Sequence, residues 1–175
     1  MNKRILLIQG IVFFLFLSCK NNTSSNLQSL LPQKINDIPI GILVDIIPDT
    51  VYASLNEDYP HTSGKYIWKY STHVSSINKE LVIEEFGAYT WYNNNWVLST
   101  IESKPYTLKD FEEWYSCDKG ILKKGVTYTD SNNWSKNDIL NNEPTKDLWY
   151  YIGKDSSNNN YLGYATVITI GKIKN

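Results

Sequence analysis

The sequence predicts an all-β domain, an antiparallel two-sheet β-sandwich with one short inserted helix at about residues 107–117. A closed β-barrel is the alternative. Three observations favour this class. Apolar and polar residues alternate with a period of two in several segments, and turn-forming residues separate those segments. Aromatic residues make up 14% of the chain, which supplies enough large side chains to fill a core between two sheets.

The first expected strands are short aliphatic runs at residues 40–47 and 51–55, with Pro48 and Asp49 between them. The segment 65–76 is the clearest strand, because large or apolar side chains alternate with mainly polar ones. The side chains that fall on its first face are Tyr66, Trp68, Tyr70, Thr72 and Val74. This alternation predicts a strand with one buried face and one wet face.

Two β-hairpins are expected. Segments 81–92 and 95–101 lie on either side of an asparagine turn, and asparagine tolerates the positive φ angles that tight turns require. Segments 148–154 and 161–173 lie on either side of a second polar turn.

The helix is expected to begin at Thr107, where Thr107 and Asp110 resemble a capping box with aspartate in place of glutamate. Phe111, Trp114 and Tyr115 then share one helical face. Residues 130–142 are expected to form a polar loop held in place by a tryptophan.

The first residues have the layout of a secretory signal. Lys3 and Arg4 precede an apolar run, residues 5–17, that is too short to span a membrane comfortably. The segment Phe16-Leu17-Ser18-Cys19 resembles the lipobox of bacterial lipoproteins, with Phe16 where that family prefers leucine. The resemblance implies that a signal peptide, residues 1–18, is removed and that the thiol of Cys19 carries a diacylglyceryl group.

A lipidated Cys19 would anchor the protein to the outer membrane. Residues 19–37 are polar and are expected to form the tether, and residues 38–175 a single β-rich domain. Surface-exported lipoproteins of the Bacteroidota often carry an acidic cluster just after the cysteine. This chain has Lys20, Asn21 and Asn22 there, so a position facing the periplasm is expected.

Several function classes lack support in the sequence. Arg4 is the only arginine, and no basic patch appears, which argues against a nucleic-acid partner. No metal or cofactor motif is present, so no cofactor is expected. A Cys–His nucleophile pair would need His61 or His73 beside Cys117. Cys117 lies at the C-terminal end of the expected helix, where the helix dipole and Asp118 both oppose a thiolate. Cys117 is therefore expected to be a small buried residue.

The favoured function is a monomeric, non-enzymatic envelope lipoprotein with a binding or structural role toward an envelope protein or a glycan. The alternative is a carbohydrate-binding accessory lipoprotein, and an enzyme of unrecognised type comes third. The candidate ligand-binding residues are Trp91, Tyr92, Trp96 and Trp134, which lie near asparagines. Sugar CH groups can stack on such rings while amide side chains bond the hydroxyls.

Overall fold

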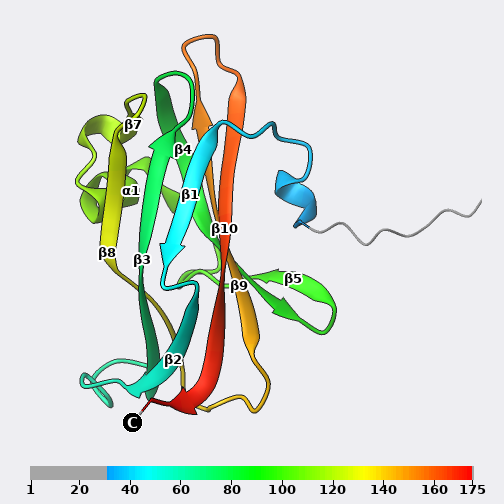
Figure 1. Ribbon diagram of the computed structural model, residues 1–175, viewed down its shortest axis with the longest axis vertical. Coiled ribbons are helices and arrows are strands. Elements are labelled where there is room, and N and C mark those ends of the chain that lie inside the picture. Colours follow the sequence, from blue (N-terminus) through cyan, green and yellow to red (C-terminus); the bar gives the residue numbers. More distant parts are fainter. Residues whose placement is uncertain (1–30, 175) are drawn as a thin grey trace, which may run out of the picture.

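The computed structural model describes residues 31–174 (Figure 1). The predicted signal peptide, Cys19 and the first part of the predicted tether lie outside the described residues. The helical elements are a 3₁₀ turn at Gln33–Ile35, α1 (Leu108–Tyr115) and a second 3₁₀ turn at Asp118–Gly120. The strands are β1 (Ile42–Ile47), β2 (Thr50–Leu55), β3 (Tyr66–Ser76), β4 (Leu81–Tyr92), β5 (Asn95–Leu98), β6 (Tyr106–Thr107), β7 (Ile121–Leu122), β8 (Thr127–Asn137), β9 (Thr145–Lys154) and β10 (Asn160–Ile173).

The described chain is mostly β with one short α-helix, which confirms the predicted class. The two-sheet sandwich is wrong, because the strands form a single mixed sheet that curls into a half-barrel (Figure 1). The strand order is β1-β3-β2-β10-β9-β4-β5, with β8 paired to β3 and with β6 and β7 paired to β4. This order does not close on itself within residues 31–174, so the alternative of a closed barrel is not observed either.

Strand β2 is the reason that one sheet forms instead of two. Its residues 50–53 pair in parallel with β10, and Ser54 and Leu55 then pair antiparallel with β3. The hydrogen-bonded ladder therefore continues from β3 to β10 instead of ending at two separate edges. Pro48 stands between β1 and β2 and has no N–H to donate, which interrupts the pairing of this part of the chain with β3.

Both predicted hairpins are present. Asn93 and Asn94 form the turn between β4 and β5 with φ angles of 48° and 60°. The second hairpin joins β9 to β10, with Lys154 opposite Asn160. The predicted helix is also confirmed, since Thr107 caps α1 and exchanges the two hydrogen bonds of a capping box with Asp110.

The prediction of a polar loop at residues 130–142 is wrong for residues 130–137, which belong to strand β8. This strand pairs with β3 along its length. The segment lacks the apolar alternation of a typical strand, because some of its polar side chains occupy the buried face of the sheet. Asp130 and Asn133 are buried there, where apolar side chains would be expected.

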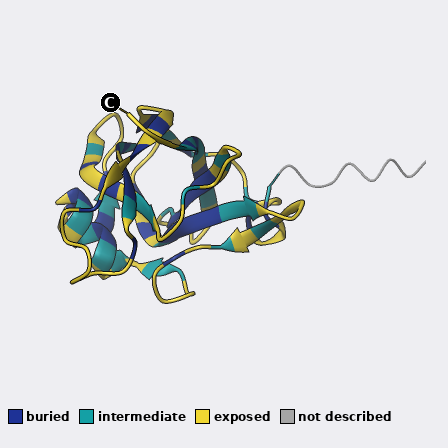
Figure 2. Ribbon diagram, turned by 90° about the horizontal axis from the view of Figure 1, so that it is seen from below, coloured by how far each residue is buried: buried dark blue, intermediate teal, exposed yellow. Residues whose placement is uncertain are grey.

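Strand β9 is buried on both faces, because its side chains point alternately to the two faces and residues 147–153 are all buried. Figure 2 shows that buried residues lie mainly along the strands, whereas the loops are mostly exposed. Trp149 and Tyr151 join the aromatic core inside the curl. Tyr150 belongs to a second cluster on the outer face, where Ile35 packs with no exposed surface. Packed structure therefore begins within the segment that the sequence assigns to the tether. No helix among residues 31–174 combines the length and the apolar character that crossing a membrane requires.

Candidate functional site

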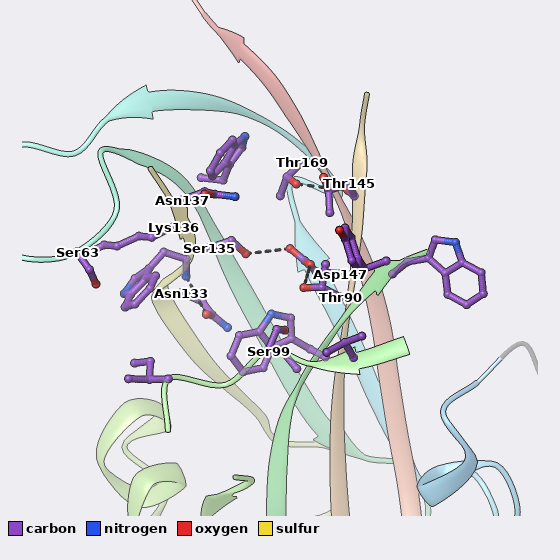
Figure 3. A pocket seen from close by; sticks show the side chains of 18 of the residues that line it. Ser63, Thr90, Ser99, Asn133, Ser135, Lys136, Asn137, Thr145, Asp147 and Thr169 are labelled. Carbon is purple, nitrogen blue, oxygen red and sulfur yellow. Dashed lines mark hydrogen bonds between the residues drawn. The ribbon is translucent and has the colours of Figure 1, made fainter. Parts of the chain in front are cut away.

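The inside of the half-barrel is not completely filled and leaves an open hollow of about 1260 Å³ (Figure 3). Strands β3 and β8 form one wall, and β4, β5 and β9 form the other. Strand β10 contributes Thr169 and Gly171, and α1 contributes Glu113 and Trp114. The hollow thus collects side chains from segments that lie far apart in the sequence.

Aromatic rings dominate the hydrophobic part of this lining. They are Trp68, Tyr92, Tyr106, Trp114, Trp134 and Trp149. Tyr92 and Trp134 are accessible, with 64% and 36% of their surfaces exposed. Trp68 and Trp149 are almost fully buried, and each indole N–H donates a hydrogen bond. The accessible rings are therefore the ones that a ligand can meet first.

Three of the four predicted binding residues line the hollow. Tyr92, at the end of β4, and Trp134, on β8, are exposed at its rim. Trp91 borders the hollow, but its ring projects to the outer face of β4, on the side of Tyr89 and Trp96. Trp96 is not part of the lining. Its ring packs edge-on against Trp91, with 5.1 Å between centroids, and Lys146 Nζ lies 5.7 Å from its centroid.

Asp147 is the most buried acidic side chain of the lining, with only 6% of its surface exposed. Its carboxylate accepts a hydrogen bond of 2.6 Å from Thr90 Oγ1 and one of 3.0 Å from Ser135 Oγ (Figure 3). The bond from Ser135 joins β8 to β9, two strands that do not pair in the sheet. Asp147 therefore holds the two walls of the hollow together.

A chain of donors leads to this carboxylate. The indole N–H of Trp149 donates to the Tyr70 hydroxyl at 2.8 Å, and the Tyr70 and Ser135 hydroxyls lie 3.1 Å apart. Because an indole can only donate and Ser135 gives its proton to Asp147, Tyr70 must donate to Ser135. Burial raises the pKa of Asp147, while the hydrogen bonds from Thr90 and Ser135 act in the opposite direction.

A second polar group lies on β8. Burial raises the pKa of Asp130, which accepts a 2.9 Å hydrogen bond from the backbone N–H of Asn132. The Asn133 amide donates to Thr72 Oγ1 at 3.3 Å, and Thr72 in turn lies 2.6 Å from the Tyr115 hydroxyl. The lining of the hollow therefore offers carboxylate, amide and hydroxyl groups beside its rings.

The residues considered for a nucleophile pair are not brought together. Cys117 is buried, and its thiol donates to the backbone oxygen of Ile121 at 3.3 Å. Burial raises the pKa of this thiol to about 11. His73 instead lies near Ser71 Oγ and Thr129 Oγ1, at 3.1 and 2.9 Å. Within residues 31–174, no three His, Cys, Asp or Glu side chains are grouped as metal ligands would be.

Asp147, Asp130 and Ser135 were not among the predicted site residues. A signal for Asp147 was present, because this lone acid directly precedes the apolar run 148–152. An acidic residue at the start of such a strand is expected to become buried and to need hydrogen-bond donors. Nothing local in the sequence identified Ser135 as one of those donors.

Comparisons with known proteins do not assign the chain to a family. No family model matches it, and no curated protein matches it at a significant level. The crystal structure of a Bordetella pertussis protein described as ApaA is similar with a TM-score of 0.42 and 10% sequence identity. The alignment covers 76% of this chain and 95% of that one. A likeness at this level carries no functional conclusion.

Proposed function

We propose that this chain is a monomeric envelope lipoprotein without enzymatic activity, which binds a glycan in the hollow of its half-barrel. The observation that carries the proposal is an open hollow with polar side chains in its lining and with the exposed rings of Tyr92 and Trp134 at its rim. Flat rings can stack on the CH faces of a sugar, and the amide and carboxylate groups beside them can bond its hydroxyls. Other envelope partners, including proteins, become the alternative if no glycan binds.

The size of the hollow favours a glycan of several sugar units. Its volume of about 1260 Å³ exceeds the roughly 300–1,000 Å³ of an ordinary small-molecule pocket. Because the hollow is open, a glycan chain could also extend beyond the lining. Asn132 and Asn137 are exposed residues of β8 in the lining, where their amides supply both donors and acceptors.

Replacement of the exposed tryptophan of the hollow tests glycan binding. With intact protein in detergent, a glycan array would identify the sugar, and calorimetry would give its affinity. Trp134→Ala is expected to weaken binding roughly tenfold, because losing a stacking contact costs about 1.4 kcal/mol. Trp96→Ala serves as the matched control and should keep its affinity, because Trp96 does not line the hollow. Retention of no glycan, or equal effects of the two substitutions, would contradict the proposal.

The anchor at Cys19 supports placement at the outer membrane facing the periplasm, and a separate substitution tests it. Cys19→Ala is expected to move the protein out of the membrane fraction and to abolish the added mass of the lipid, since no thiol remains to carry the diacylglyceryl group. Cys117→Ala is the control, because that buried thiol should leave both readouts unchanged. An unchanged membrane fraction and mass for Cys19→Ala would rule out lipid attachment at this residue.

A further inference from the structure

The charges in the hollow are unbalanced. Three carboxyl groups line it, those of Glu113, Asp130 and Asp147, whereas Lys136 supplies the lining's ammonium. None of the ion pairs found among residues 31–174 includes any of the three acids. The pKa of Asp147 responds to burial, Thr90 and Ser135, and the pKa of Asp130 to burial and a backbone N–H. Residues 31–174 thus supply no cationic partner for these two buried acids.

The network around Asp147 accommodates the charged form of its carboxylate. The donor chain from Trp149 through Tyr70 and Ser135 directs a proton at one carboxylate oxygen, and Thr90 directs a proton at the other. A carboxylate has about four acceptor sites, so two further hydrogen bonds fit on it. A buried carboxylate without a counter-ion is costly, and a bound cation would offset that cost.

The Trp134 ring, at the rim of the hollow, already holds an ammonium group. Lys136 Nζ lies 4.4 Å from the centroid of the Trp134 ring, which is within the range of a cation–π contact. Lys136 and Trp134 both line the hollow. A ligand ammonium would find the same kind of ring surface at this rim, on the side of β8 opposite to Ser135 and the carboxylate of Asp147.

Resting on the proposed function, we infer that the glycan bound in this hollow carries free amino groups, with Asp147 receiving a protonated amine of the sugar. The preferred class is an amino-sugar oligomer, in contrast to the same oligomer with its amines acetylated. Acetylation removes the positive charge and adds bulk, and it leaves Asp147 without the cation.

A matched pair of ligands tests the inference on the intact protein in detergent. The probes are a glucosamine oligomer and the N-acetylated oligomer of the same length and linkage, at a pH where the amines are protonated. The wild-type protein is expected to bind the glucosamine oligomer roughly tenfold more tightly, equivalent to about 1.4 kcal/mol. Asp147→Asn should remove most of this preference. Asp45→Asn should retain it, because Asp45 lies on the exposed face of β1 outside the hollow.

The possible outcomes separate this inference from the glycan-binding proposal. Equal binding of the two oligomers by the wild-type protein, or preference for the acetylated one, would overturn the inference and leave glycan binding in place. An unchanged preference in a folded Asp147→Asn variant, checked by its melting curve, would also overturn it. Failure to bind either oligomer or any arrayed glycan would overturn both. The wild-type comparison decides even if Asp147→Asn does not fold.

Discussion

Phe86→Ala is expected to lower the free energy of unfolding by about 3–5 kcal/mol, the range for removing a buried phenylalanine ring. Phe86 has no exposed surface and lies at the centre of the aromatic core. Its nearest ring neighbours, with centroid distances of 5.2–6.1 Å, are Tyr106, Phe111, Trp114, Tyr115 and Tyr151. Because these neighbours come from β6, α1 and β9, they cannot all move in to fill the resulting cavity.

Urea denaturation measures this effect, and two variants give its scale. Phe86→Leu should cost clearly less than Phe86→Ala, because it leaves a smaller cavity. Tyr92→Ala should change stability by no more than about 0.5 kcal/mol, since most of that side chain is exposed. A Phe86→Ala variant as stable as Tyr92→Ala would show that the core does not depend on this ring.

Gly163→Ala is expected to destabilise the protein by about 1–3 kcal/mol, the cost of overfilling a packed interior. A Cβ atom at residue 163 would lie 2.6 Å from Ile42 Cβ and 2.7 Å from the Ile42 carbonyl oxygen. Ile42 is buried on β1, so its backbone would have to move away from β10. The glycine is therefore what allows β1 to lie directly against β10.

Gly153→Ala is the matched control, because Gly153 lies on the other strand of the same hairpin. A Cβ atom there would meet Ile42 Cδ1 and Leu81 Cβ at 3.3 Å, and a shift of a few tenths of an ångström relieves such contacts. Thermal melting should therefore show a smaller loss for Gly153→Ala than for Gly163→Ala. Equal losses would mean that the close approach of β1 to β10 does not limit stability.

The local parts of the fold were predictable from the sequence. Alternation identified segment 65–76 as a strand, the asparagine turn at 93–95 located a hairpin, and Thr107 with Asp110 located the start of the helix. The sheet arrangement was not predictable, because alternation reports which face is buried and is the same in a sandwich and in a half-barrel. The parallel pairing of β2 with β10 joins residues more than a hundred positions apart.

The candidate site was predictable only in part. Trp91, Tyr92 and Trp134 were proposed because rings beside asparagines can bind sugars. The structure places Tyr92 and Trp134 at the rim of one hollow, whereas the ring of Trp91 lies on the outer face of β4. Trp96 has the same local sequence setting but lies outside the lining. The environment of Asp147 depends on Ser135, which reaches it across the curl of the sheet, and on the buried Tyr70 behind it. Contacts of this kind leave no local pattern in a sequence.

The packing of Ile35 on the outer face of β9 places the start of the described chain on the side of the domain opposite the hollow. Ile35 lies with Leu148 and Tyr150, whereas Asp147 and Trp149 project from the opposite face of the same strand into the hollow. The polypeptide that leads back toward Cys19 therefore leaves from the convex side. A lipid anchor at Cys19, as proposed above, would therefore join the domain on the side away from the hollow. Envelope glycans could then enter the hollow without competing with membrane lipids for the same surface.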